Sequence, residues 1–168
     1  MKKSFFFLFF SIIALNIACS QNPPASPRMT ADGKDVKVTY GQPSKKGRVI
    51  FGADGSQSLE KYGKVWRTGA NEATVITFKK DGKFGGKEVK AGDYGLFTIP
   101  GEKEWVVILN SEPKQWGAYS YKVDKDVLRV TVPNIALKEP VEKLTFEVKN
   151  NALVFSWDTS SFSVPLQF

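Results

Sequence analysis

Polar and aromatic residues gather in the stretch from Trp66 to Glu72, which holds the first candidates for chemistry. The planar guanidinium of Arg67 suits a carboxylate, a phosphate or a sugar hydroxyl. Asn71 and Glu72 add donors and acceptors, and Trp66 could stack on a sugar or an aromatic ring. A structural alternative pairs Arg67 with Glu72 across a turn. Gly69 would then supply a positive φ, Asn71 would cap the backbone and Trp66 would lie in the core.

Four further residues complete the set of binding candidates. Trp116 and Tyr119 lie in the expected loop 111–125, where either ring could stack on a ligand. Tyr40 and Arg48 flank a Gly-Pro turn, and a structural role is favoured for both. The candidate ligand-binding residues are therefore Trp66, Arg67, Asn71, Glu72, Trp116, Tyr119, Tyr40 and Arg48.

The composition excludes several classes of enzyme. The chain has no histidine, which removes Ser-His-Asp and Cys-His arrangements and all histidine-ligated metals. Its one cysteine, Cys19, lies ahead of the expected domain, so the domain has no thiol nucleophile, thiolate site or disulfide. No glycine-rich phosphate-binding motif is present. We expect no metal and no cofactor.

Carboxylate chemistry of the glycosidase type remains open, because it needs only two acids about 5–9.5 Å apart. The candidate acids are Glu72, Asp54, Asp93, Glu102 and Asp126, and their spacing singles out no pair. The sequence leaves enzymatic activity undecided and favours its absence.

The first 20 residues are predicted to be a secretory signal peptide. Lys2 and Lys3 form a positive start, and Phe5–Ala18 is apolar apart from Ser11 and Asn16. This run is shorter than the roughly 18–20 residues that a membrane-spanning helix needs. We therefore expect an exported protein.

Cys19 leaves two ways to process this peptide. The segment from Leu15 to Cys19 resembles a bacterial lipobox, in which Cys19 would be lipidated and become the mature N-terminus. Ordinary cleavage after Ser20 is the alternative. The expected location is accordingly a membrane-anchored lipoprotein or a periplasmic or secreted protein. Residues 21–30 are rich in Pro and Ser and are expected to form a flexible tether.

The net charge of +7 is spread along the chain among acids and glycines. No basic block with stacking aromatics occurs, so nucleic acid is not an expected partner. The expected partners are a small molecule, a glycan or an envelope protein, with membrane contact only through an N-terminal lipid.

The rest of the chain, residues 31–168, shows the short alternating patterns of β-strands. Segment 104–110 is apolar on both faces and is expected to be a central strand. Asp81-Gly82 indicates a hairpin turn after the strand at 73–79, and Asn150-Asn151 indicates another turn. Trp105 and Trp157 are expected in the core. The predicted fold is a single all-β domain, an antiparallel β-sandwich or jelly roll of eight to ten short strands.

Several segments together resemble a known family. They are the segment from Tyr40 to Arg48, Ile50–Gly52, the segment from Tyr62 to Thr74, the segment from Leu96 to Gly101 and Gln115–Tyr119. In this order they resemble the bacterial exported family catalogued as domain of unknown function 2911, over about residues 26–168. The resemblance implies an exported single domain and no established activity.

The leading hypothesis is a non-enzymatic exported binding domain of the cell envelope for a small molecule, glycan or partner protein. One alternative is a carboxylate-dependent hydrolase acting on glycans, with Glu72 as acid or base. The other is a purely structural interaction module, which would present a flat apolar patch instead of a pocket.

Overall fold

The computed structural model describes residues 25–168. The expected signal peptide and Cys19 lie outside the described residues. The first strand begins at Arg28, earlier than the expected domain start at residue 31, because Arg28–Asp32 pairs with the next strand. The elements in chain order are β1 (Arg28–Asp32), β2 (Val36–Gly41), β3 (Phe51–Gly52), β4 (Glu60–Lys61), β5 (Thr74–Phe78), β6 (Gly82–Phe84), β7 (Lys87–Val89), β8 (Gly92–Ile99), β9 (Glu104–Asn110), the 3-10 helix η1 (Val123–Lys125), β10 (Asp126–Pro133), β11 (Ile135–Lys149) and β12 (Ala152–Gln167).

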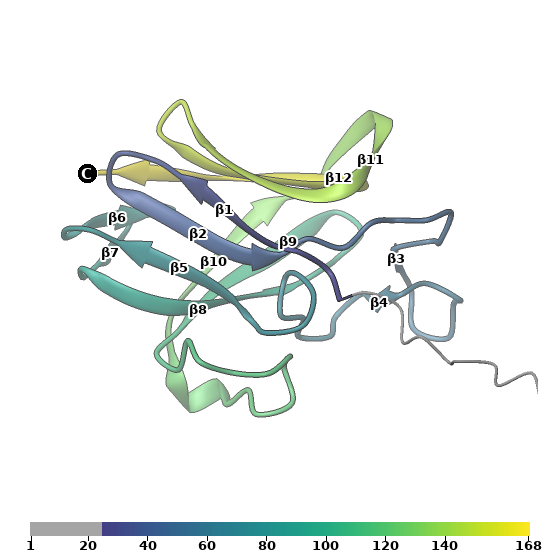
Figure 1. Cartoon of the computed structure of the whole chain (residues 1–168), viewed down its shortest axis with the longest axis horizontal. Helices are drawn as coiled ribbons and strands as arrows, with labels where there is room; N and C mark the ends of the chain where they lie inside the picture. The colour runs from purple at the N-terminus through teal and green to yellow at the C-terminus, as the bar shows by residue number, and fades with distance from the viewer. Residues whose placement is uncertain (1–24) are drawn as a thin grey trace, which may run out of the picture.

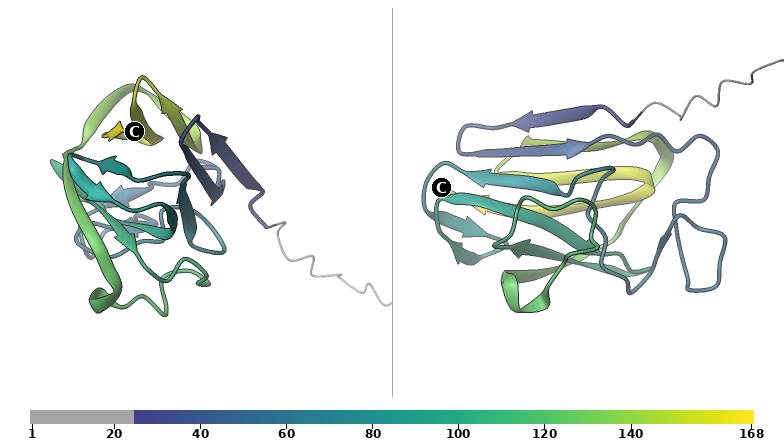
Figure 2. Two further views of the ribbon diagram at one scale, coloured as in Figure 1. Left: turned by 90° about the vertical axis from the view of Figure 1, so that its left-hand side faces the viewer. Right: turned by 60° about the horizontal axis from the view of Figure 1, so that its bottom comes forward.

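Two antiparallel sheets form most of the domain (Figure 1), and β3 and β4 pair in parallel as a separate two-stranded sheet. The six-stranded sheet has the order β1-β2-β5-β8-β9-β10, and the four-stranded sheet has the order β11-β12-β6-β7. Figure 2 shows β11 and β12 lying over one face of the larger sheet. This arrangement confirms the predicted all-β, sandwich-like single domain. The strands within residues 25–168 outnumber the eight to ten expected because β3, β4, β6 and β7 are too short to give a clear periodic pattern.

An aromatic core fills the space between the two sheets. Trp105 of β9 and Trp157 of β12 are both buried, as predicted. Phe51 of β3 lies edge-on to each, with ring centroids 4.8 Å and 5.9 Å away. Such edge contacts between aromatic rings add to the free energy gained by burying their apolar area.

Strand β9 is covered on both faces, as its apolar pattern predicted. Trp105 and Leu109 face the main core, whereas Ile108 packs with Phe97 on the opposite face of the sheet. Tyr121, from the segment after β9, stacks at a tilt on Phe97 with ring centroids 5.0 Å apart. The loop between β9 and β10 therefore lies on the outer face of the six-stranded sheet and covers a second, smaller core.

The predicted turns had different outcomes. Asn150 and Asn151 both have positive φ, 51° and 54°, and join β11 to β12, so this turn is confirmed. The hairpin predicted at Asp81-Gly82 is wrong. Strand β5 pairs with β2 and β8, whereas β6 pairs with β12 and β7, so the chain crosses between sheets here. Among residues 25–168, no helix has the length and apolar character needed to span a membrane.

Candidate ligand-binding site

Two of the predicted binding residues are buried in the core. Trp66 is 3% exposed and stacks on Trp157, with centroids 5.9 Å apart and ring planes at 17°. Tyr40 packs edge-on against Phe146, and its hydroxyl accepts a hydrogen bond from the Phe146 N–H at 3.3 Å. Neither ring faces solvent, so the structural alternative describes both better than ligand contact does.

The turn between Trp66 and Glu72 is held by backbone geometry that differs from the prediction. Thr68 and Asn71 have positive φ, 53° and 63°, and Gly69 does not. Gly69 is needed for a close approach instead, since a Cβ there would lie 3.0 Å from the Gly41 carbonyl oxygen. The buried Thr68 hydroxyl lies 3.1 Å from that of Thr98 on β8, which fixes the turn to the sheet.

Arg67 and Arg48 lie near the carboxylate of Glu60, which is not among the candidate residues predicted from the sequence. Glu60 of β4 is half-buried, and this burial raises the pKa of its carboxyl to about 7. The positive charges of Arg67, Arg48 and Lys61 act in the opposite direction and limit the rise. The Nε of Arg67 is buried and has no hydrogen-bond partner among the described residues. Strand β4 has only two residues, which is too short for a periodic sequence pattern that would single out Glu60.

Glu72 pairs with a different arginine from the one expected. Its carboxylate lies 3.6 Å from a guanidinium nitrogen of Arg28, on strand β1. The same guanidinium donates a weak hydrogen bond to the Ala73 carbonyl oxygen at 3.4 Å. Both charged side chains remain partly exposed to solvent. The expected Arg67–Glu72 pair is therefore replaced by Arg28–Glu72.

This ion pair borders a pocket of about 290 Å³ that contains Trp116. Trp116 is 63% exposed, although the other three tryptophans are buried. The backbone of Trp116 forms a β-bridge with Glu72, which attaches the loop after β9 to the turn before β5. The pocket is lined by Arg28, Glu72, Ala73, Val75, Pro113, Lys114, Gln115 and Trp116.

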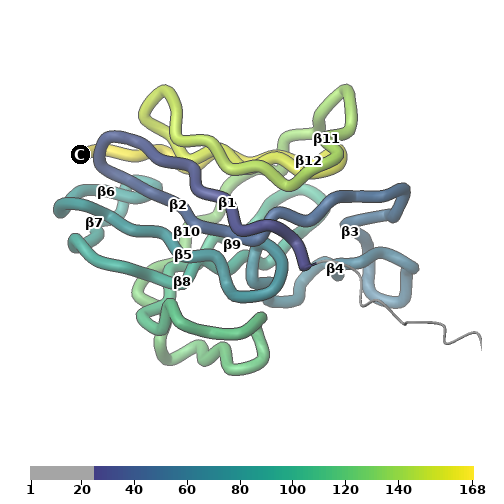
Figure 3. Tube along the Cα trace, viewed as in Figure 1, coloured from purple at the N-terminus to yellow at the C-terminus, as the bar shows by residue number. Residues whose placement is uncertain are grey.

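Asn71 joins two segments at the edge of this pocket. Its Nδ2 donates to the Ser26 carbonyl oxygen at 3.0 Å, just ahead of β1. Its own carbonyl oxygen accepts from the Gly117 N–H, also at 3.0 Å. The chain path in Figure 3 shows the start of β1 beside the turn before β5. Asn71 thus has a positioning role.

Tyr119 is 87% exposed and does not line the pocket. Its ring lies against the backbone of Gly117, where a Cβ would be 3.0 Å from the nearest ring carbon. Gly117 has a φ of 67°, which favours glycine for a second reason. The structure therefore brings together Glu72 and Trp116 of the predicted set and places Tyr119 outside the pocket.

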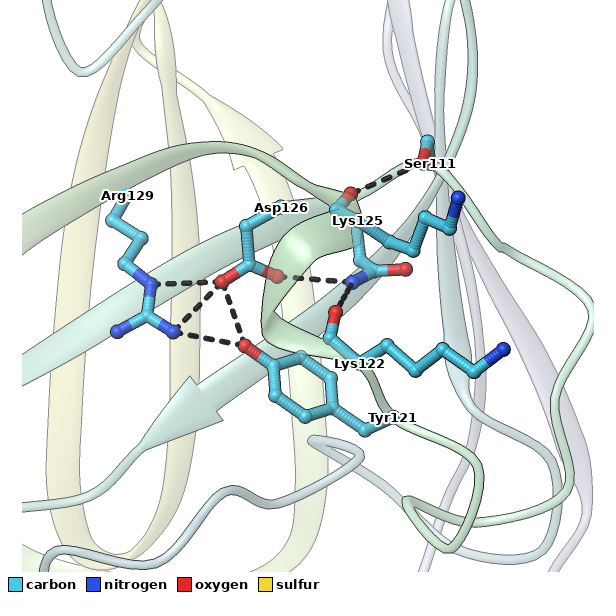
Figure 4. Close-up of polar contacts among 7 residues, drawn as sticks. Ser111, Tyr121, Lys122, Lys125, Asp126 and Arg129 are labelled. Carbon is cyan, nitrogen blue, oxygen red and sulfur yellow. Dashed lines mark hydrogen bonds and ion pairs between the residues drawn. The ribbon is translucent and has the colours of Figure 1, made fainter.

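A polar network fixes the base of the loop that carries Trp116 (Figure 4). The buried Asp126 carboxylate accepts hydrogen bonds from Tyr121 Oη at 2.7 Å, Arg129 Nε at 2.8 Å and Asn110 Nδ2 at 2.9 Å. Asn110 also donates to the Lys122 carbonyl oxygen. Burial and the Asp126 carboxylate raise the pKa of Tyr121 to about 12, so Tyr121 remains a donor at neutral pH.

Removing this carboxylate should loosen the loop. We expect Asp126→Ala to lower the free energy of unfolding by about 2–3 kcal/mol, because three donors would lose a charged acceptor. Amide hydrogen exchange in segment 111–125 should also become faster than in wild type. The matched control is the exposed Asp124, where alanine should change stability by no more than about 0.5 kcal/mol. Equal effects at both positions would contradict the role of the network.

A larger open hollow of about 730 Å³ lies at another place, between the β6–β7 hairpin and the C-terminus. Its charged rim includes Lys90 and Asp81, which pair with each other at 2.8 Å on the surface. It contains none of the predicted binding residues. Among the described residues, no three side chains of the metal-ligating types His, Cys, Asp and Glu come together. The Trp116 pocket is therefore the better candidate site.

Comparison with known proteins gives one match. A family model described as "Protein of unknown function (DUF2911)" matches residues 22–166. No curated protein and no solved structure matches the chain. The match spans nearly the whole sequence and agrees with the resemblance seen in its motifs. The chain therefore belongs to the DUF2911 family of proteins of unknown function.

Proposed function

We propose that this domain binds a ligand in the Trp116 pocket and does not chemically convert it. The observation that carries the proposal is an exposed tryptophan on an anchored loop, beside a pocket with a charged pair at its border. A large aromatic side chain left in water gains free energy when a ligand covers it. The pocket volume of about 290 Å³ lies just below the roughly 300–1,000 Å³ typical of ligand sites, so the pocket suits one ring-sized group.

The hydrolase alternative has less support. Glycoside hydrolysis uses two carboxyl groups facing one bond. Of the eight residues that line the pocket, Glu72 is the one carboxylate, and it is paired with Arg28. The alternative of a purely structural module called for a flat apolar patch, whereas Trp116 borders a pocket. Binding is thus the function that these residues support best.

The proposal includes the place where binding occurs. We propose that the protein acts in the cell envelope or outside the cell, on a small molecule, a glycan or an envelope protein. This part of the proposal rests on residues 1–20, whose sequence pattern indicates export, and on Cys19 within them, which is the expected site of lipidation. Mass spectrometry of the mature N-terminus would show whether it carries a lipid.

Tryptophan fluorescence provides the direct test. Of the four tryptophans, Trp116 alone should be quenched readily by acrylamide, because Trp66, Trp105 and Trp157 are at most 3% exposed. A compound that binds in the pocket should protect Trp116 from quenching and raise the thermal midpoint of the wild type. Trp116→Ala should abolish that rise without itself changing stability by more than about 0.5 kcal/mol. Compounds that stabilise both proteins equally would place the binding site elsewhere.

A further inference from the structure

The loop between β9 and β10, residues 111–125, carries a group of exposed apolar side chains. They are Trp116, Tyr119 and Val123, and the exposed Val127 follows at the start of β10. Within residues 25–168, nine large hydrophobic side chains are exposed, and these four belong to one short segment. Figure 1 shows this loop projecting away from the two sheets. Single exposed apolar residues are ordinary, whereas a group of them on one projecting loop indicates a contact surface.

Three lysines lie among these apolar residues. Lys114 and Lys122 are exposed, and Lys125 is half-buried. Glu112 and Asp124 offset two of the three positive charges, so the loop has a net charge of +1. Lysine is depleted where two proteins meet, but its long stem lets the ammonium group reach the phosphates of a lipid bilayer. Tryptophan and tyrosine favour the same interfacial layer, because their rings are apolar with one polar group.

The start of the described chain lies beside this loop. Asn71 joins the two segments, since it donates to the Ser26 carbonyl oxygen and accepts from the Gly117 N–H, both at 3.0 Å. Ser26 follows Cys19, the expected site of lipidation, by seven residues. An extended chain spans at most about 3.3–3.6 Å for each residue, so a lipid on Cys19 would hold Ser26 within about 25 Å of the bilayer. Such an anchor would therefore bring the loop close to a membrane.

We infer that loop 111–125 docks on the surface of a lipid bilayer, with Trp116, Tyr119 and Val123 in the interfacial layer and the lysine ammonium groups at the lipid phosphates. This inference goes beyond ligand binding in the Trp116 pocket, and it rests on the proposed location in the cell envelope. The Asp126 network already fixes the base of the loop, so docking costs little ordering of the chain. A second contact besides the N-terminal lipid would fix the orientation of the domain on the membrane.

The test uses lipids that carry bromine atoms on their acyl chains, which quench only those tryptophans that lie in or at the bilayer. The mature protein, as the cell produces it, is added to vesicles of phosphatidylcholine and phosphatidylglycerol with and without bromine. Trp116 is the reporter, because the other three tryptophans are at most 3% exposed. We expect bromine to lower the fluorescence of Trp116 by about half or more. Trp116→Phe should remove this decrease.

Two matched variants test whether the apolar residues of the loop make the contact. Val123→Asp places a charge on the loop and should reduce the quenching at least about threefold, and Tyr119→Asp should act in the same direction. Val49→Asp is the control, because it makes the same change outside the loop at a similar exposure, 60% against 65% for Val123. Its quenching should stay within about a fifth of the wild-type value, and the thermal midpoints of all three variants should match that of wild type.

The inference is wrong if the mature protein binds neither kind of vesicle, or if it binds both with equal fluorescence. It is also wrong if Val123→Asp and wild type are quenched equally. Protection of Trp116 from acrylamide in native membrane fragments, without quenching by brominated lipid, would assign the loop to a membrane protein instead. Ligand binding in the pocket is tested separately, by acrylamide quenching and thermal stabilisation without vesicles. A failed compound screen would therefore count against the pocket and leave lipid docking unaffected.

Discussion

Replacing Trp66 with alanine should lower the free energy of unfolding by about 3–5 kcal/mol, the range for a large buried aromatic side chain. Trp66 stacks on Trp157 and lies edge-on to Phe155, with centroids 6.1 Å apart, so its removal would leave a cavity at the centre of the aromatic core. Urea unfolding followed by far-ultraviolet circular dichroism would measure the loss.

Trp116→Ala is the matched control for this prediction, because it makes the same chemical change at an exposed site. The two substitutions should differ in their effect on unfolding by at least about 2 kcal/mol. A Trp66 variant as stable as the Trp116 variant would show that Trp66 is not part of the core. Trp66 would then again be a candidate for contact with a ligand.

Replacing Glu60 with glutamine should stabilise the protein above neutral pH and leave it unchanged in acid. Burial raises the pKa of Glu60 from 4.5 to about 7, so the folded state binds the proton more tightly than the unfolded state. The stability that this proton contributes is complete below about pH 4.5 and is lost as the pH rises through about 7. At 1.36 kcal/mol for each pKa unit, the loss is about 3 kcal/mol.

Urea unfolding of wild type and Glu60→Gln at about pH 4, 6 and 8 would test this expectation. The variant should gain up to about 3 kcal/mol at pH 8, less at pH 6 and almost nothing at pH 4. Glu139→Gln, at an exposed position of β11, is the control and should show no such trend. A gain of equal size at every pH would assign the effect to packing. A loss at pH 8 would show that the nearby positive charges outweigh the cost of burying the carboxylate.

The sequence predicted the parts of the fold that depend on local patterns. Segment 104–110 is apolar on both faces, which predicts a central strand, and β9 is indeed covered on both faces. The Asn150-Asn151 pair predicts a turn because asparagine tolerates positive φ, and both residues have positive φ. The pairing between strands could not be predicted, because the alternation of apolar and polar residues assigns the faces of a strand but not its neighbours. The Asp81-Gly82 error has this origin: the local turn signal is the same whether the next strand returns to the same sheet or crosses to the other.

The candidate site was only partly predictable for the same reason. Trp116 and Glu72 were identified by their residue types, but Arg28 lay in the expected tether and became part of the site through the pairing of β1 with β2. Gln115 carries no signal of its own in the sequence, because its place beside the pocket depends on how the loop after β9 folds back. Residue type therefore indicates which side chains could bind, and long-range pairing decides which of them meet.

The position of β12 has a consequence for the timing of folding during synthesis. This last strand pairs with both β11 and β6, and it brings Phe155, Trp157 and Phe162 into the core. A growing chain that has not reached residue 152 therefore lacks the strand that joins β11 to β6 and completes the covering sheet. We expect the domain to fold only once its synthesis is complete, and slowly, because its decisive contacts join residues far apart in the sequence. Until then, aromatic residues of the nascent chain that remain exposed to water favour aggregation.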